Sequence, residues 1–245
     1  MQFSRPSHKV LILVLVLLGM GSFASAAIIA PPPSRIDMSM KVGNGNSYPI
    51  SADVTKVEVG DKTEYHVDGT YNQHGYEMTV HFVIDPDPTI FGNVAIRNTL
   101  ATTQEYTLTF PLPVSPSFNS SLLSGSVGLT TTADATAATV AALPGDAIYS
   151  ALIDGASAPS RMLLKDPFSL SAGAGLSNTA SDSFGIPVPL SDGPVNAEIG
   201  IKFHFTVTPG DQAGITSQFT ANPVPEPTAL LGLAIGGLVL ARRRK

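Results

Sequence analysis

The 245-residue sequence contains no cysteine and no tryptophan. Without cysteine the chain forms no disulfide, so its stability must come from a hydrophobic core, and a cysteine nucleophile or a thiolate metal site is excluded. Without tryptophan, any sugar-binding surface lacks the side chain with the largest stacking area, which weakens the interpretation of this chain as a sugar-binding protein with an aromatic platform. The motifs G-x-S-x-G of serine hydrolases and H-E-x-x-H of zinc hydrolases are also missing. The sequence therefore indicates no catalytic residue.

Basic residues are scarce in the middle of the chain. Six of the 14 Lys and Arg residues lie in the first 26 and last 24 residues, as does one of the 19 Asp and Glu residues. The intervening residues 27–221 therefore carry eight basic and 18 acidic side chains, a formal net charge of −10. Nucleic-acid binding needs clustered cations, so this class of function is excluded for the body.

The N-terminus has the three parts of a secretory signal peptide. Arg5 and Lys9 give a positive start, residues 10–18 are uninterrupted apolar residues, and Ala24 and Ala26 form a small-x-small cleavage pattern before Ala27. An uncleaved anchor helix is the alternative, but the apolar run is short and is followed by Gly19. We expect residues 1–26 to be removed by cleavage after Ala26 and the rest to be exported.

The C-terminus also has three parts in a fixed order. A Pro-rich box comes first, made of Val224, Pro225, Glu226 and Pro227. Residues 228–241 follow, apolar from Ala229 onwards, and a basic end completes the chain, made of Arg242, Arg243, Arg244 and Lys245. A helix over residues 229–241 would span roughly 20 Å, shorter than the roughly 30 Å bilayer core, so it predicts a marginal transmembrane helix. Basic residues favour the cytoplasmic side, so the body is expected outside.

The tail resembles the PEP-CTERM sorting signal, in which a Pro-Glu-Pro box precedes an apolar helix and a basic end. The resemblance covers residues 222–245 and implies recognition by an exosortase, a membrane-embedded cysteine transpeptidase. It also implies transient residence in the inner membrane and delivery to the cell surface or extracellular matrix, where exopolysaccharide is an expected partner. A weaker resemblance of the body to β-rich ectodomains found before such tails implies no activity.

The body, residues 27–221, has the pattern of an all-β protein. Residues 78–84 alternate Met78, Val80, Phe82 and Ile84 with more polar residues, and Pro-, Gly- and Asp-rich turns separate the short β-prone runs. Residues 169–183, rich in Ser, Ala and Gly, predict a long surface loop. This pattern predicts a β-sandwich of immunoglobulin-like or jelly-roll type, flanked by the signal helix and the transmembrane helix. The further strands are predicted at residues 65–71, 94–100, 105–110, 126–132, 147–153, 162–165, 197–207 and 214–220.

Two ligand chemistries remain open from the residues alone. Asp85 and Asp87 flank Pro86 and are weak candidates for calcium, although Asp next to Pro is also a plain turn former. A second possibility is a polysaccharide hydrolase, which needs two facing carboxylates that sequence spacing cannot select. His66 and His74 could meet across a hairpin as metal ligands, but we expect them to be residues on the polar face of a strand, without a metal role.

The sequence supports one preferred function and two alternatives. The preferred one is an exported, non-enzymatic β-sandwich that an exosortase processes and that acts at the cell surface or in a biofilm matrix. The first alternative is a secreted polysaccharide hydrolase built on the same sandwich. The second is an ectodomain that stays anchored in the membrane without processing.

Overall fold

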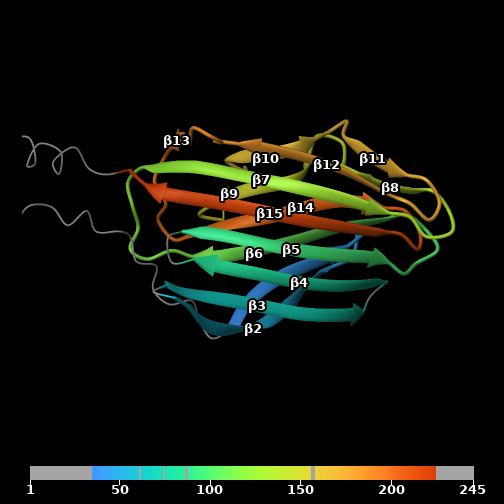
Figure 1. Cartoon of the computed structure of the whole chain (residues 1–245), viewed down its shortest axis with the longest axis horizontal. Helices are drawn as coiled ribbons and strands as arrows, with labels where there is room; N and C mark the ends of the chain where they lie inside the picture. Colours follow the sequence, from blue (N-terminus) through green and yellow to red (C-terminus); the bar gives the residue numbers. More distant parts are fainter. Residues whose placement is uncertain (1–34, 61, 74, 86–87, 156–157, 225–245) are drawn as a thin grey trace, which may run out of the picture. The chain divides into compact units, whose positions relative to one another are not determined.

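The computed structural model describes residues 35–224, apart from 61, 74, 86–87 and 156–157, as a protein of β-strands alone (Figure 1). Within these described residues no helix is long and apolar enough to cross a membrane. The all-β prediction is thereby confirmed for the body. The predicted signal peptide with its predicted cleavage residues and the tail from Pro225 onwards, including both predicted flanking helices, lie outside the described residues. The strands are β1 (Arg35–Val42), β2 (Ser47–Val59), β3 (Lys62–Gln73), β4 (Tyr76–Asp85), β5 (Thr89–Asn98), β6 (Gln104–Pro113), β7 (Ser121–Thr132), β8 (Ala138–Ala141), β9 (Ala147–Ile153), β10 (Arg161–Lys165), β11 (Ser169–Ala172), β12 (Ser177–Phe184), β13 (Leu190–Asp192), β14 (Glu198–Val207) and β15 (Gln212–Pro223).

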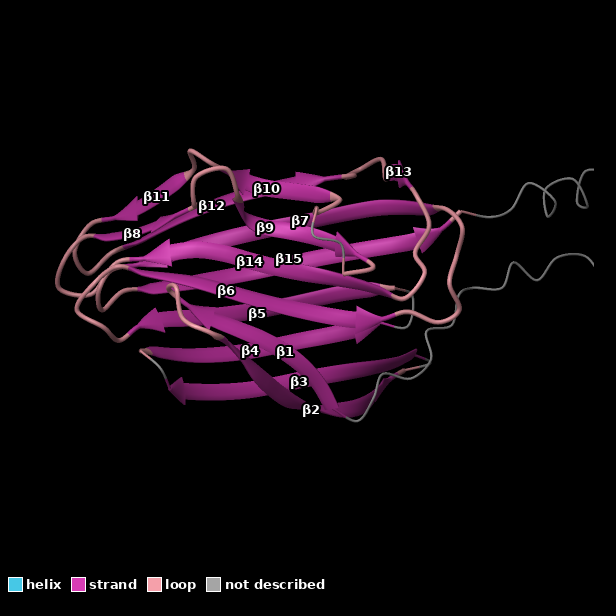
Figure 2. Cartoon of the chain, turned by 180° about the vertical axis from the view of Figure 1, so that it is seen from behind, coloured by secondary structure: helices cyan, strands magenta, loops and turns pink. Residues whose placement is uncertain are grey.

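The strands form two antiparallel sheets that lie face to face. Sheet A runs in the order β10-β9-β14-β6-β1 and ends with the first half of β2, while the β8–β11 pair extends it beside β14. Sheet B begins with the second half of β2 and runs β3-β4-β5-β15-β7-β12, with β13 pairing the start of β7. Sheet B is nearer the viewer in Figure 1, and sheet A is nearer in the reverse view of Figure 2.

Strand β2 passes from one sheet to the other and so closes one side of the sandwich. Its residues 47–53 pair with β1 in sheet A, and residues 54–59 pair with β3 in sheet B. On the opposite side the edge strands β10 and β12 come together, where the Leu164 N–H donates to the Asp182 carboxylate at 3.2 Å. Asp182 lies on an edge strand, and charges on edge strands discourage pairing with other chains.

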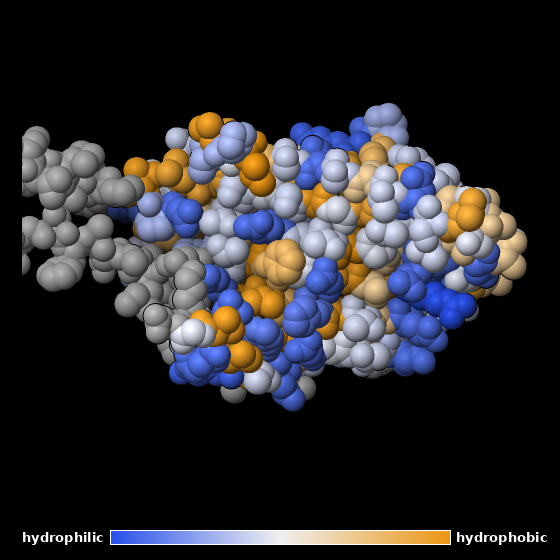
Figure 3. Space-filling view, in the orientation of Figure 1, coloured by the Kyte–Doolittle hydropathy of each residue, from blue (hydrophilic) through white to orange (hydrophobic). Residues whose placement is uncertain are grey.

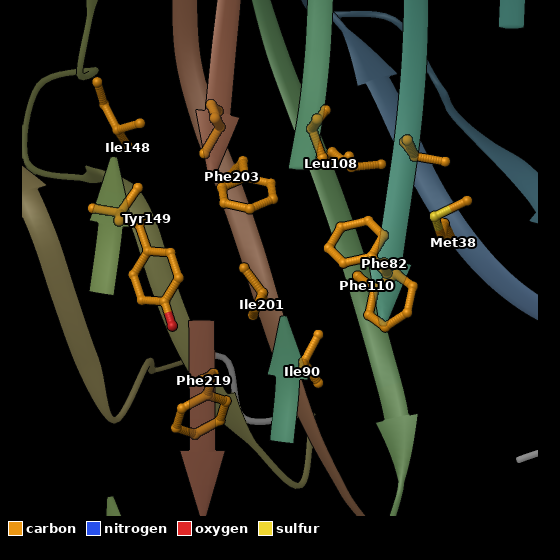
Figure 4. Packing of buried hydrophobic residues seen from close by; sticks show 14 of the residues in the cluster. Met38, Phe82, Ile90, Leu108, Phe110, Ile148, Tyr149, Ile201, Phe203 and Phe219 are labelled. Atoms are coloured by element: carbon orange, nitrogen blue, oxygen red, sulfur yellow. The ribbon is translucent and has the colours of Figure 1, made fainter. Parts of the chain in front are cut away.

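The hydrophobic core lies between the two sheets and follows the period-2 rule of strands. On β4, Met78, Val80, Phe82 and Ile84 are buried, as the sequence predicts, while the residues between them point outward. The rings of Phe82 on sheet B and Phe110 on sheet A stack at a centroid distance of 4.1 Å, which joins the sheets at the centre (Figure 4). Burial of such rings is the main source of stability in a chain that has no disulfide.

One predicted loop is in fact folded into strands. Residues 169–183 contain β11 and most of β12, where we predicted a surface loop. The prediction was wrong because β12 is an edge strand exposed on both faces, so its sequence carries no alternation of apolar and polar residues. Its only inward apolar contacts with the core are the partly buried Ala180 and Phe184.

Candidate functional site

Few of the sequence-predicted site residues fall in the described part of the chain. Asp85 is the last residue of β4, while Asp87 lies outside the described residues. Val224 directly follows β15, and the rest of the Pro-rich box and the basic end lie outside. Among the residues that the structure describes, no group of three or more His, Asp or Glu side chains is placed to hold a metal ion.

A histidine on the outer face of sheet A is held by carboxylates on both sides. His204 Nδ1 lies 2.6 Å from Asp146 Oδ2, and His204 Nε2 lies 2.9 Å from Glu105 Oε1. Lys202 Nζ also donates to Asp146 at 3.1 Å. Burial alone would raise the pKa of Asp146, but the hydrogen bonds from His204, the Ala147 N–H and Lys202 together lower it. Since both ring nitrogens are engaged, this histidine joins β6, β14 and the β8–β9 turn and has no free nitrogen for a substrate.

The outer face of sheet B gathers polar side chains from five strands. Because cross-strand partners point to the same side, the register of β3, β4, β5, β15 and β7 sets these side chains in rows. We call this surface the polar face, and Figure 3 shows blue and white atoms spread over it with orange and tan atoms among them. Three successive rows are Asn72–Glu77–Arg97–Gln212–Thr132, Thr70–Thr79–Ala95–Gly214–Thr130 and Asp68–His81–Asn93–Thr216–Gly128.

The polar face contains a shallow hollow of about 300 Å³. Ala95, on the floor of the hollow, is small, and its neighbour Gly214 on β15 has no side chain, so the surface dips between taller polar side chains on either side. Glu77 is the one carboxylate in this lining, so the hollow does not contain the facing carboxylate pair of a glycosidase. The lining residues are Thr70, Tyr71, Asn72, Glu77, Met78, Thr79, Ala95, Arg97 and Gln212.

Ionisable groups on the polar face contact one another. Arg97 Nη1 lies 3.7 Å from the Glu77 carboxylate, and its Nε donates to the Gly210 carbonyl at 3.1 Å. His81 Nδ1 lies 2.5 Å from Asp68 Oδ1. The face therefore presents hydroxyl, amide, guanidinium, imidazole and carboxylate groups, which together can both donate and accept hydrogen bonds.

An aromatic ring stands at one side of this surface. Phe91 lies on β5 four residues before Ala95, a separation of about 13 Å along the strand. Its side chain points outward between Val83 and Gln218 and is 41% exposed. An exposed phenyl ring offers a flat apolar surface beside polar groups, the combination that tryptophan usually supplies.

Sequence reasoning did not identify the polar face. Its residues come from positions 68–132 and 212–216, and only strand register brings them together. The alternation on β4 predicts that Glu77, Thr79 and His81 share one face of their strand. It does not predict which residues of the neighbouring strands lie beside them. His66 and His81 lie side by side with ring centroids 5.7 Å apart, while His74, expected opposite His66, lies outside the described residues.

No protein-family model matches this chain, and no curated protein matches it. Two of the solved structures to which this chain is similar are carbohydrate-binding modules. TmCBM61, in complex with β-1,4-galactotriose, is 12% identical with a TM-score of 0.25, and the match covers 54% of this chain and 71% of that one. The family 11 module from Clostridium thermocellum, in complex with a β-1,3-1,4-mixed-linked tetrasaccharide, is 11% identical with a TM-score of 0.26, covering 78% and 99%. Likeness at this level does not bear on function.

Proposed function

We propose that this protein is an exported cell-surface or matrix protein whose β-sandwich binds polysaccharide on the polar face and whose tail is processed by an exosortase. The binding role is carried by one observation, the hollowed polar face of sheet B with the exposed Phe91 beside it. The sorting role is supported by the order of the Pro-rich box, apolar run and basic end in residues 224–245.

The side chains of the polar face match the chemistry of a sugar chain. Asn72 and Gln212 each carry one amide that both donates and accepts, and Arg97 donates in a fixed planar geometry. Neighbouring sugar hydroxyls also donate and accept, so these groups are suited to them. The Phe91 ring supplies the apolar partner for the C–H face of a sugar. Strands fix the backbone of all four residues, so no loop has to be ordered on binding.

Affinity electrophoresis of the exported form in gels containing candidate polysaccharides tests the binding role. We expect retardation by at least one neutral polysaccharide, and Phe91→Ala and the double variant Asn72→Ala/Gln212→Ala should each weaken it. A lost hydrogen bond is worth about 0.5–1.5 kcal/mol, which corresponds to roughly 3–10-fold in affinity. Thr109→Ala, on the outer face of sheet A, is the matched control and should leave the retardation unchanged.

Two outcomes of this experiment contradict the binding role. One is that no polysaccharide retards the protein. The other is that the polar-face variants bind as well as the wild type while Thr109→Ala does not, which would move the site to sheet A. Circular dichroism of each variant confirms that the fold is retained.

Expression in a host with and without an exosortase tests the sorting role. We expect the intact mass of the exported protein to fall by a segment of the tail only when the enzyme is present, and Glu226→Ala to prevent this. An unprocessed anchored ectodomain, the alternative reading, predicts the same mass in both hosts and normal surface display of Glu226→Ala. The sorting role rests on the tail alone, so its failure leaves the binding role intact.

A further inference from the structure

The segment between β12 and β13 exposes three large apolar side chains. It reads Gly185-Ile-Pro-Val-Pro-Leu190 and contains no charged residue. Ile186 is 56% exposed, Val188 73% and Leu190 41%. Figure 3 shows hydrophobic atoms gathered at the upper left, over the place where Figure 1 has β13. We call residues 185–190 the apolar bulge.

The apolar bulge is forced outward by the register of its flanking strands. Phe184 pairs with Gly125 of β7, and Leu190 pairs with Leu123, only two residues further along. Residues 185–189 therefore occupy the space that the single residue Ser124 spans on β7, so they have to protrude. Gly185 begins the protrusion with a φ of 65°, and a side chain there would collide with the Leu123 carbonyl. Pro187 and Pro189 fix φ at two further positions, which restricts the conformations open to the segment.

The apolar bulge lies at the end of the sandwich where the body's last strand finishes. Ser121 of β7 pairs with Asp192 of β13 on one side and with Pro223 of β15 on the other. Neighbouring strands are about 4.8 Å apart, so β13 and the end of β15 are separated by about 10 Å. The apolar tail segment starts at Ala229, six residues beyond Pro223, which an extended chain spans in at most about 22 Å.

We infer that the apolar bulge is a membrane-contact element that rests on the lipid surface while the tail is anchored in the bilayer. This inference rests on the membrane-anchored precursor of the proposed function. A tether of that length keeps the end of β15 near the bilayer, and Ile186, Val188 and Leu190 then gain from leaving water. Since the bulge has no charge, the contact is with the apolar part of the interface and does not need anionic lipid. A docked body keeps the sorting motif at the membrane surface, where a membrane-embedded enzyme acts.

The absence of tryptophan from the chain makes a direct test possible. We would introduce a single reporter, Val188→Trp, into the precursor that retains its tail and reconstitute it in phosphatidylcholine vesicles. The emission maximum should shift to shorter wavelength in vesicles, and lipids with brominated acyl chains should quench it. Leu176→Trp, at a 63% exposed position in the β11–β12 turn, is the matched control and should show neither change. Ile186→Trp, on the same bulge, should reproduce the result of Val188→Trp.

The outcomes separate this inference from the function on which it rests. If the precursor does not float with the vesicles, tail anchoring itself is wrong. If it floats but Val188→Trp and Ile186→Trp emit as in water, the membrane-contact element is wrong and anchoring stands. A blue shift that requires no lipid and grows with protein concentration would mean that a second copy of the protein covers the bulge. A blue shift produced by polysaccharide without lipid would mean that the bulge binds the polysaccharide. Both results overturn the inference.

Discussion

Single side chains in this fold hold backbone segments that the strands leave unpaired. Asp154 follows β9 in the left-handed region, with a φ of 54°, a conformation that Asp tolerates better than most residues. Its Oδ1 accepts the N–H groups of Asn196, Ala197 and Glu198 at 2.9, 2.7 and 3.2 Å. Burial alone would raise the pKa of Asp154, but these hydrogen bonds together lower it below its ordinary value of 3.8. The carboxylate thus ties the end of β9 to the start of β14.

We predict that Asp154→Ala lowers the free energy of unfolding by about 1–2 kcal/mol at pH 7, a value reduced because the carboxylate is partly solvated. Since the folded-state pKa lies below the unfolded value of 3.8, this stabilisation is present above that pH and is lost as the pH falls through the folded-state pKa. Urea unfolding followed by circular dichroism at pH 7 and at pH 3 measures both effects. Equal destabilisation at the two pH values would contradict the prediction, and Asp154→Asn, which keeps one acceptor, should be milder.

At Gly92 the absence of a side chain leaves space for a neighbouring core ring. This glycine lies on β5 opposite Phe82 of β4, and a Cβ placed on it would overlap the Phe82 ring. Phe82 in turn stacks on Phe110 of the other sheet. The position is therefore restricted by packing in the core and not by backbone conformation.

Gly92→Ala should destabilise the protein by about 2–3 kcal/mol, because the added methyl group displaces the stacked rings. Gly128→Ala is the matched control on β7, since its nearest neighbour would be the Thr216 carbonyl oxygen at 4.0 Å. The control should be neutral, and thermal unfolding of the two variants compares them directly. Similar melting temperatures for both variants would show that Phe82 has room to move.

The end of strand β5 is held in place by the hydrogen bonds of one side chain. Asn98, its last residue, is fully buried, and its Nδ2 donates to the carbonyls of Thr102 at 2.8 Å and of Val207 at 3.0 Å. Its Oδ1 accepts the Leu100 N–H at 2.9 Å. One amide therefore links β5 of sheet B to β14 of sheet A and shapes the β5–β6 turn.

Replacing Asn98 should lower the free energy of unfolding far more than replacing an exposed amide on the same strand. We expect Asn98→Ala to lower the free energy of unfolding by about 3 kcal/mol, because the buried Val207 carbonyl, the part-buried Thr102 carbonyl and the Leu100 N–H all lose their partner. Asn93→Ala, on the polar face, should cost under about 1 kcal/mol. Chemical unfolding of both variants provides the measurement. Equal losses would mean that water replaces the Asn98 amide.

For the whole molecule, three of the six tyrosines are part of the core. Tyr76, Tyr106 and Tyr149 are at most 2% exposed, and burial raises the pKa of all three. Tyr149 on sheet A donates its hydroxyl to the Gln218 carbonyl of sheet B at 3.0 Å, and Tyr106 donates to the Gly75 carbonyl at 3.1 Å. These rings hold the sheets together only in the neutral form.

We therefore predict that the protein unfolds cooperatively in alkali. A folded-state pKa above the unfolded value near 10 means that this stabilisation is present below pH 10 and is lost as the pH rises further. Absorbance at 295 nm, free of tryptophan, should show the three buried tyrosines ionising together with the loss of the circular dichroism signal. Tyr106→Phe should remove one tyrosine from that step. A single smooth titration of all six with intact circular dichroism would contradict this.

The structure confirms the predicted strands, which lie in or overlap β3, β4, β5, β6, β7, β9, β10, β14 and β15. Strands β2, β8 and β13 were not predicted, nor was β1, although Ile36, Met38 and Met40 alternate there, and β11 and β12 were predicted as a loop. Alternation reports only whether a strand has one buried face, so an edge strand in water on both faces gives no signal. The choice between an immunoglobulin-like and a jelly-roll order also depends on pairing, which is not written in any one segment.

The amino-acid sequence by itself determined the β class of the body, the inward residues of its best strands and the chemistry of its two ends. Those features are local, because side-chain period and the chemical character of a segment are properties of neighbouring residues. The tertiary structure alone decided that Asn72, Arg97 and Gln212 share a surface and that residues 185–189 protrude. Backbone hydrogen bonds are the same for every residue pair, so register is set by the packing of the whole core, and surfaces assembled by register appear only once the core is complete.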